Sequence, residues 1–202
     1  TEGRISAKAA IKYCVENPDM PEVDQAKVDE LKAKTYAPMK LYEDTKDYAV
    51  GDLHKGYTYS EEINPNWIDP KMLMFRIQKI MDEYVAGVAT YYTTNEHMLA
   101  LAEQKLEMLK EDALKMRAKD LHELLRAWEN YHRILTAEAH MKHIQFREES
   151  RYPGFYYRMD KNFVDEENWK CFVNSVYDKN TKEWTCFKRA HTDLVDKSKL
   201  FK

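Results

Sequence analysis

Apolar residues recur every three or four positions along the middle of the chain, which is the spacing of one helical face. The pattern occurs three times between residues 69 and 150. Its members are Leu73, Ile77, Ile80, Tyr84, Gly87 and Tyr91, then Leu99, Ala102, Leu106, Leu109 and Ala113, then Leu121, Leu124, Trp128, Tyr131, Leu135 and Ala139. Short polar links separate the three runs, so they predict an antiparallel three-helix bundle over residues 69–150.

Each predicted helix has a start signal. Asp69 before Pro70 is typical of an N-cap followed by a first turn, and we expect that helix to run to about Thr90. The two later helices begin with pairs that have capping-box spacing, Thr93 with Glu96 and Asp120 with Glu123.

Shorter signals precede the bundle. Residues 4–16 predict a helix rich in small residues, which Pro18 ends. Residues 22–46 predict a charged amphipathic helix that Pro38 should kink. The polar and aromatic stretch over residues 47–68 predicts a loop insertion.

After Pro153-Gly154 the period changes from that of a helix to that of a strand. Two short alternating runs flank a turn over residues 178–182: Trp169, Cys171 and Val173, then Trp184, Cys186 and Lys188. They predict a β-hairpin. The expected fold is therefore mainly α, with an antiparallel three-helix bundle, preceding helices and a C-terminal hairpin.

Composition excludes several classes of protein. The mean hydropathy is −0.76 and no run reaches the ~20 apolar residues of a membrane span. A net charge of −3 gives no basic face for a nucleic-acid polymer. Three cysteines without a CxxC pair indicate reduced thiols and a cytoplasmic protein. The dinucleotide fingerprint GxGxxG is missing, so we expect no complete nucleotide-binding domain within these residues.

The sequence gives only weak indications of a metal site or of a catalytic nucleophile. Glu129 and His132 form one ExxH pair, whereas a di-iron bundle needs two, and His140 with His143 repeats only the spacing. We favour hydrogen-bonded histidines and expect no metal. Ser150 stands outside any GxSxG context.

The segment Arg147–Arg158 is unusual, because three arginines and four aromatic residues fall within twelve positions. Arginine beside tyrosine favours planar, bidentate or stacked contacts over simple solvation. Two readings remain open, a structural clamp and an anion or partner site, and the chemistry favours the clamp.

This segment also carries a family resemblance. Ser150-Arg151, then Arg158, Asp160 and Trp169, resembles the C-terminal helical domain of the succinate dehydrogenase and fumarate reductase flavoprotein family. That family has a Ser-Arg-Gly, Arg-x-Asp, then Trp pattern, from which the sequence after Arg151 departs. Three longer strings resemble one branch, the alpha subunits of dissimilatory adenylylsulfate reductase: Asp120–Tyr131, Arg147–Arg158 and Trp169–Asp178.

The resemblance implies roles for the first residues. Gly3, Ser6 and Ala7 would lie near the FAD of a flavin-binding domain, and Arg4 would match a catalytic arginine on the substrate side. Ser6 and Lys8 depart from the relatives' Gly and Asn. The implied divisions are the end of an FAD-binding domain (1–20), a helix and loop insertion (21–68), the bundle (69–150), and the Arg/Tyr loop with hairpin (151–202).

The resemblance further implies reduction of adenosine 5'-phosphosulfate to sulfite and AMP, or the reverse, with electrons from an iron–sulfur beta subunit. Because the chain starts at Thr1 in helical sequence, we expect a fragment that is inactive alone. A standalone helical interaction module without cofactor is the alternative.

Overall fold

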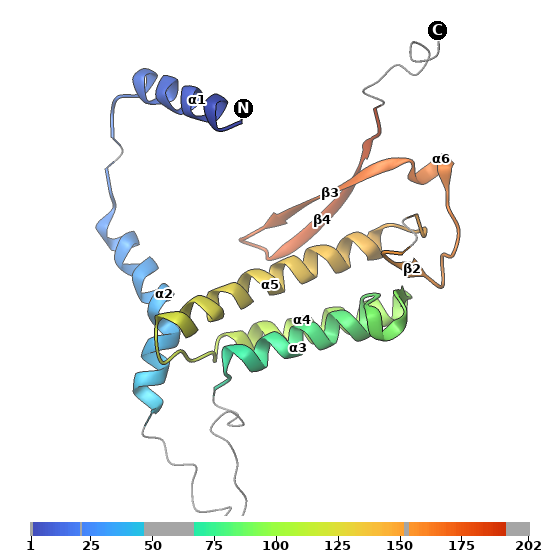
Figure 1. The fold of residues 1–202 in the computed structure, drawn as a ribbon, viewed down its shortest axis with the longest axis horizontal. Coiled ribbons are helices and arrows are strands. Elements are labelled where there is room, and N and C mark those ends of the chain that lie inside the picture. Colours follow the sequence, from blue (N-terminus) through green and yellow to red (C-terminus); the bar gives the residue numbers. More distant parts are fainter. Residues whose placement is uncertain (1, 21, 47–66, 152–153, 193–202) are drawn as a thin grey trace, which may run out of the picture. The chain divides into compact units, whose positions relative to one another are not determined.

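A computed structural model gives the fold of the chain and describes residues 2–20, 22–46, 67–151 and 154–192 (Figure 1). It contains two compact units, Thr1–Ala37 and Pro38–Lys202. Helices dominate the described residues, which confirms the mainly α prediction.

The first unit holds α1 (Glu2–Glu16) and the beginning of α2 (Gln25–Thr45). Both helices occur where the sequence predicts them. α1 has no buried residue, and its large apolar side chains are more than half exposed: Ile5, Ile11, Tyr13 and Val15. This unit therefore has no hydrophobic core in the described residues, and its helices present apolar side chains to their surroundings.

Pro38 lies inside α2, which continues past it to Thr45, and its side chain is buried. Its carbonyl accepts a hydrogen bond from the Ala118 amide (3.0 Å). Most of the predicted loop over residues 47–68 falls outside the described residues. Its last residues, Trp67 and Ile68, are buried, and the Ile68 amide donates to the Lys115 carbonyl (2.9 Å).

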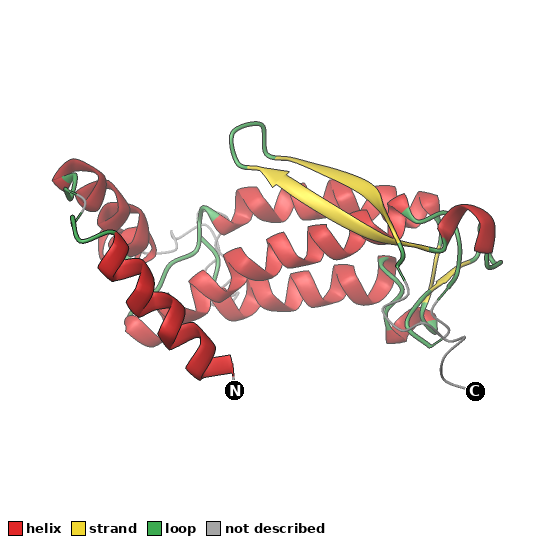
Figure 2. Ribbon diagram, turned by 90° about the horizontal axis from the view of Figure 1, so that it is seen from above, coloured by secondary structure: helices red, strands yellow, loops and turns green. Residues whose placement is uncertain are grey.

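Three long helices form the centre of the second unit: α3 (Pro70–Tyr84), α4 (Glu96–Ala113) and α5 (Leu121–Phe146). They lie side by side in Figure 2. Two hydrogen bonds give the direction of α4 against α3: Ile68, before α3, bonds to Lys115, after α4 (2.9 Å), and Thr94, before α4, bonds to Tyr84 at the end of α3 (2.7 Å). Two ion pairs give its direction against α5, because the earlier residue of α4 pairs with the later residue of α5: Glu103 with Lys142 (2.6 Å) and Lys110 with Glu138 (2.5 Å). α4 therefore runs antiparallel to both α3 and α5.

The buried face of α4 agrees with its sequence pattern at all five expected positions: Leu99, Ala102, Leu106, Leu109 and Ala113. α5 differs. Leu124 is buried, but Leu121 and Leu135 are 66% and 38% exposed. The face that turns inward instead carries Ala127, Asn130, Ile134, Ala137, Glu138, Met141 and Ile144. The predicted stripe is therefore right at Leu124 and wrong at Leu121 and Leu135, while Tyr131 is partly buried against the core. Small and polar side chains turn inward because they find close packing or specific partners in neighbouring helices.

α3 ends at Tyr84, six residues earlier than predicted. Ala86 adopts a left-handed conformation (φ 58°), which interrupts helical hydrogen bonding. A Cβ at Gly87 would collide with the backbone of Asp82, so the chain can turn here only with glycine. The 3₁₀ turn η3 (Val88–Thr90) follows, and Tyr91 beyond it is 86% exposed.

The start of α4 is also corrected. Asn95, not Thr93, caps the helix, since its side chain accepts from the Met98 amide (2.9 Å). Thr93 belongs to the short strand β1 (Thr93–Thr94), which pairs in parallel with β2 (Tyr157–Arg158). By contrast, Asp120 caps α5 as predicted, accepting from the Glu123 amide (2.9 Å).

The predicted C-terminal hairpin is confirmed. The short helix α6 (Glu166–Trp169) leads into β3 (Cys171–Asp178), which pairs antiparallel with β4 (Glu183–Ala190). The hairpin lies along α5 in both ribbon views (Figures 1 and 2). This packing supplies the support that an isolated two-stranded ribbon lacks in water.

Candidate functional site

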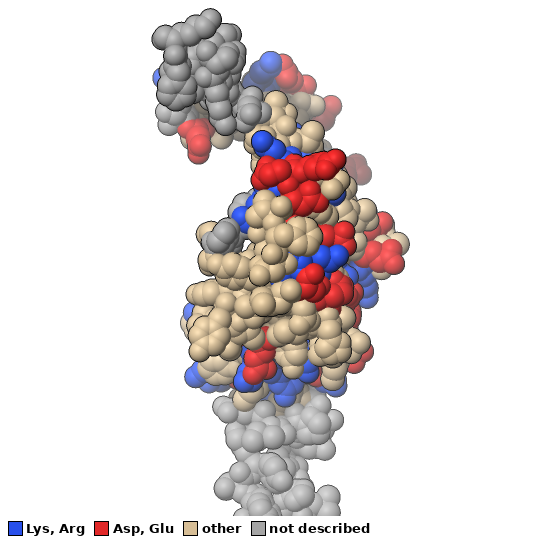
Figure 3. Space-filling model, turned by 90° about the vertical axis from the view of Figure 1, so that its right-hand side faces the viewer, with Lys and Arg blue, Asp and Glu red and all other residues tan. Residues whose placement is uncertain are grey.

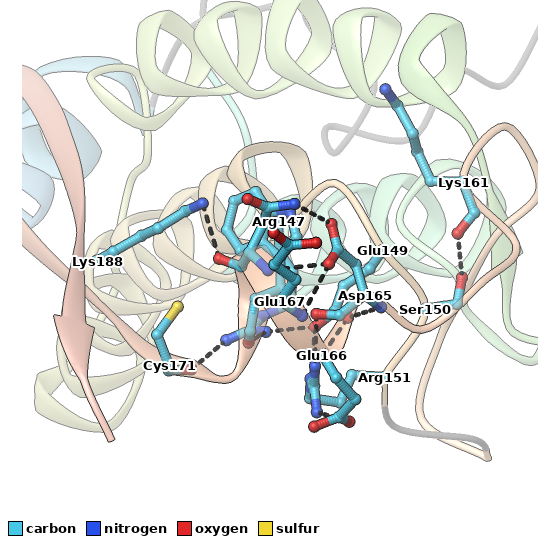
Figure 4. Close-up of polar contacts among 12 residues, drawn as sticks. Arg147, Glu149, Ser150, Arg151, Lys161, Asp165, Glu166, Glu167, Cys171 and Lys188 are labelled. Atoms are coloured by element: carbon cyan, nitrogen blue, oxygen red, sulfur yellow. Dashed lines mark hydrogen bonds and ion pairs between the residues drawn. The ribbon is translucent and has the colours of Figure 1, made fainter. Parts of the chain in front are cut away.

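A buried carboxylate organises the Arg147–Arg158 segment. Glu149 is fully buried directly after the end of α5. Arg151 binds both of its oxygens, Nε to Oε1 at 2.5 Å and Nη2 to Oε2 at 3.0 Å. The Asp165 amide donates to Oε2 (2.8 Å). Figure 4 shows these groups converging on the Glu149 carboxylate.

Arg147, the C-cap of α5, approaches the same carboxylate. Its Nη1 lies 2.6 Å from Glu149 Oε1 and 3.0 Å from the Trp169 carbonyl, and its Nη2 donates to the Cys171 carbonyl (2.8 Å). The guanidinium also lies 5.5 Å from the centre of the Trp169 ring. A single side chain thus connects the bundle to the beginning of the hairpin.

The charge of Glu149 is stabilised by these contacts. Burial alone would raise the pKa of its carboxyl group, but hydrogen bonds from Arg151, the Asp165 amide and Arg147 outweigh burial and lower the pKa below its usual value. The ionised form therefore fits this site, because a buried charge is tolerated when it is paired and hydrogen-bonded.

A second arginine connects β2 to the bundle. Arg158 is 1% exposed and makes a two-pronged pair with Asp160, Nε to Oδ1 at 2.9 Å and Nη2 to Oδ2 at 2.7 Å. Its Nη1 donates to the carbonyls of Ile144 (3.0 Å) and Gln145 (3.2 Å) in the last turn of α5. A cation there also complements the negative end of the helix dipole.

Arg158 reaches α4 as well. Its Nη2 lies 3.0 Å from Glu96 Oε2, and Asp160 Oδ2 accepts from the Glu96 amide (3.2 Å). The pKa of Asp160 is lowered, chiefly by the hydrogen bond from Arg158. The first turn of α4 and the last turn of α5 are therefore joined through one arginine–carboxylate pair.

Ser150 fixes the turn between these two clusters. The Arg158 amide donates to its hydroxyl oxygen (2.8 Å), and the hydroxyl lies within hydrogen-bonding distance of the Arg158 and Lys161 carbonyls. The Ser150 amide donates to Phe163 (2.9 Å). These contacts use the hydroxyl structurally, in agreement with its lack of a nucleophile motif.

Each of the three arginines therefore has a carboxylate partner within the chain: Glu149 for Arg147, Glu149 and Glu166 for Arg151, and Asp160 and Glu96 for Arg158. Such pairing leaves the clamp as the better interpretation of the segment. The sequence pattern identified the arginines but missed Glu149 as their common partner. An acidic residue between two arginines was the available signal.

The residues that the resemblance connects with flavin and substrate lie elsewhere. Gly3, Arg4, Ser6 and Ala7 occupy the first turns of α1, and all four are exposed. A Cβ added at Gly3 would meet open space. The fold of the described residues therefore makes no demand for glycine here, and the Arg4 side chain is accessible.

The ExxH pair has a different use. Glu129 accepts hydrogen bonds from Arg126 (2.8 Å) and Arg133 (3.1 Å), and the bond from Arg126 is the main cause of its lowered pKa. Among the residues that the structure describes, His, Cys, Asp and Glu side chains form no group of three that could hold a metal ion.

The surface agrees with the low net charge. On the face shown in Figure 3, both acidic and basic side chains border a broad area of other residues. None of the helices in the described part of the chain is both long enough and apolar enough to cross a membrane.

Comparison with known proteins extends the sequence resemblance, although no protein-family model matches the chain. The chain is 45% identical over 194 residues to the adenylylsulfate reductase subunit alpha of Megalodesulfovibrio gigas. That match covers 96% of this chain and 28% of the relative, so the chain spans less than a third of its relative's length.

Solved structures agree. An adenosine-5-phosphosulfate reductase in complex with sulfite as a covalent adduct, and the adenylylsulfate reductase of Archaeoglobus fulgidus, each match with a TM-score of 0.84 and 49% identity, over 96% of this chain and 29% of theirs. A chain of the Mycobacterium smegmatis Sdh1 complex matches with a TM-score of 0.60 and 18% identity, over 92% and 27%, which shows a shared fold.

The chain thus shares its fold with a chain of a succinate dehydrogenase complex. Its sequence and its fold both match one part of adenylylsulfate reductase alpha subunits.

Proposed function

We propose that this chain is the C-terminal part of the FAD-containing alpha subunit of an adenylylsulfate reductase in the cytoplasm. The observation that carries the proposal is the 45% identity to an adenylylsulfate reductase alpha subunit over 96% of the chain. The remainder of such a subunit would supply most of the FAD site, and an iron–sulfur beta subunit would supply electrons.

The proposed reaction is the reduction of adenosine 5'-phosphosulfate to sulfite and AMP, or its reverse. In the reducing direction two electrons go to sulfur, the bond between sulfur and the bridging phosphate oxygen breaks, and AMP leaves. A flavin bound by the whole subunit would supply that electron pair. The residues of this chain contribute by binding, by orientation and by support of the flavin domain.

The first turns of α1 fit a place beside a flavin and its anionic substrate. Arg4 is exposed and always cationic, so it would bind a sulfate or sulfite group. The free amides at the start of a helix of 15 residues favour nearby negative charge. Gly3, with open space at its Cβ position, allows a planar ring to approach, and Ser6 and Ala7 are small.

The second unit would act as support. The Glu149 and Arg158 clusters connect α4, α5, β2 and the hairpin into one body. The chain by itself lacks the rest of the flavin site and is therefore expected to be inactive alone.

The test uses the whole protein that contains this chain. Purified with its flavin, it should show flavin absorbance that changes when sulfite is added, and it should form AMP from adenosine 5'-phosphosulfate with a reduced electron donor. A protein that binds no flavin, or whose flavin spectrum ignores sulfite and which forms no AMP, would refute the assignment.

Arg4 has its own test in that protein. Arg4→Ala should lower turnover and raise the KM for adenosine 5'-phosphosulfate, with partial recovery in Arg4→Lys, while flavin content stays constant. Lys12→Ala is the matched control, because Lys12 is an exposed cation two turns further along the same helix. Equal activity in the Arg4→Ala and Lys12→Ala proteins would remove Arg4 from the site.

A further inference from the structure

The outer face of the β3–β4 hairpin carries apolar side chains that stay about half exposed in the described fold, although the centre of the Phe172 ring lies 5.5 Å from that of the His191 ring. Phe172, Val176 and Phe187 are 53%, 59% and 44% exposed. Asn174 pairs with Phe187 in the register, so Phe187 lies diagonally between Phe172 and Val176 on one face. These three residues form a single patch, which we call the hairpin patch.

The opposite face of the hairpin is already in use. Side chains alternate between the two faces of a strand, so Val173, Tyr177, Trp184 and Cys186 lie on the other side, and all four are partly buried. The hairpin packs along α5. A ribbon that is packed on one face and apolar on the other is suited to lie between two bodies.

The hairpin also differs in charge from the chain that carries it. Residues 170–190 contain five basic residues and two acidic ones, whereas the whole chain has a net charge of −3. All five basic residues are exposed: Lys170, Lys179, Lys182, Lys188 and Arg189. Lys188 lies on the other face of the hairpin, where its ammonium group is 3.6 Å from the centre of the Trp169 ring, so it does not border the patch. Arg189 lies directly opposite Phe172 in the register and so borders the hairpin patch.

From these observations we propose that the hairpin patch is a docking surface for an acidic segment of a separate polypeptide, one that presents apolar side chains between carboxylates. The apolar residues supply the buried area, and Arg189 with the net positive charge of the hairpin selects for negative charge and accelerates association. The proposal is independent of the reaction assigned above, because it uses no residue of α1.

A pair of designed peptides tests it. One labelled peptide alternates Phe and Leu with Glu, and the other replaces every Glu with Lys. Fluorescence anisotropy with the 202-residue chain should show binding of the acidic peptide that weakens with added salt, and at least about tenfold weaker binding of the basic one. Equal affinities, or no binding of either peptide, would overturn the proposal.

Variants locate the surface. Phe172→Ala and Phe187→Ala should each weaken the acidic peptide by about tenfold, as expected for central aromatic contacts. Phe75→Ala on α3 is the matched control, because Phe75 is 49% exposed and should leave binding unchanged. A Phe75 variant as weak as the hairpin variants would overturn the proposal, since binding would then be unspecific.

Two further measurements separate other occupants. Sedimentation velocity that shows self-association abolished by Phe187→Ala would assign the patch to a second copy and overturn an acidic partner. The whole protein that contains the chain should bind the acidic peptide as the chain does. If only the chain binds, the remainder of the same protein covers the patch, and the proposal fails.

Discussion

Arg151 binds both oxygens of Glu149, and Glu149 is fully buried while Arg151 reaches the surface to meet Glu166 (2.8 Å). The planar guanidinium of Arg151 donates to two carboxylates at once, those of Glu149 and Glu166. The single ammonium group of a lysine cannot reproduce this geometry.

We therefore expect Arg151→Lys and Arg158→Lys each to lower the free energy of unfolding by roughly 1–3 kcal/mol, through lost charged hydrogen bonds. Urea unfolding followed by circular dichroism measures this. Arg126→Lys is the control, since its pair with Glu129 is half exposed and should change stability by at most about 0.5 kcal/mol. Unchanged midpoints in both clamp variants would contradict the clamp.

The clamp should also make stability depend on pH. The pKa of Glu149 is lower in the folded state than its ordinary value of 4.5. Its contribution is therefore complete above that value and is lost as pH falls through the folded pKa. Urea midpoints measured at decreasing pH below 4.5 should fall for the native protein, with a shallower decline for Glu149→Gln.

The same variant has an effect at neutral pH. Glu149→Gln leaves Arg147 and Arg151 without their shared charge, so we expect a loss of roughly 3 kcal/mol at pH 7. Glu148→Gln is the neighbouring control, because Glu148 is exposed and forms an ion pair with the partly exposed Lys161 (3.3 Å). If the Glu149→Gln and Glu148→Gln proteins were equally stable, the charge of Glu149 would not be needed to balance the two arginines, and the prediction would be wrong.

Gly87 should tolerate no side chain. A Cβ there would lie 2.6 Å from the Asp82 carbonyl oxygen, so Gly87→Ala should cost roughly 1–3 kcal/mol of stability by overpacking. Gly154→Ala has open space but a φ of +86°, and strain alone should cost about 1 kcal/mol. Gly3→Ala, in open space on a helix, should cost nothing. Thermal unfolding of the three variants gives the order.

Asn130 tests the face of α5 that the structure places inward. It is 1% exposed, and its Nδ2 donates to the Pro70 carbonyl (2.6 Å) at the beginning of α3. Asn130→Ala should cost roughly 1–3 kcal/mol, because the buried carbonyl loses its donor. Leu135→Ala, on the face predicted from sequence, should cost less than Asn130→Ala. The opposite order in urea unfolding would restore the predicted stripe.

The order of helices, the bundle and the hairpin could be predicted because each depends on local periodicity. α4 is the clearest case, since its five core positions are all Leu or Ala at helical spacing. Asp120 and the hairpin turn were predictable for the same reason, because a cap or a turn is decided by neighbouring residues.

The face of α5 could not be predicted in this way. Asn130 and Glu138 are polar, and only partners on α3 and α4 make their burial favourable. The early end of α3 was missed for a different reason, because the apolar spacing continues through Gly87 and Tyr91 although Ala86 adopts a left-handed conformation. Asn95 caps α4 in place of the predicted Thr93, because Thr93 pairs with a strand more than sixty residues later in the sequence.

The Arg147–Arg158 segment was predicted in part from the sequence and decided in part by tertiary contacts. Its composition alone indicated planar, charged contacts, and its motifs alone indicated the family. Which carboxylates the arginines bind was decided by the tertiary structure, because Glu96 lies 62 residues from Arg158 along the chain. Local sequence determines which groups can form strong pairs, whereas the approach of α4, α5 and α6 determines which pairs lose their water and become buried.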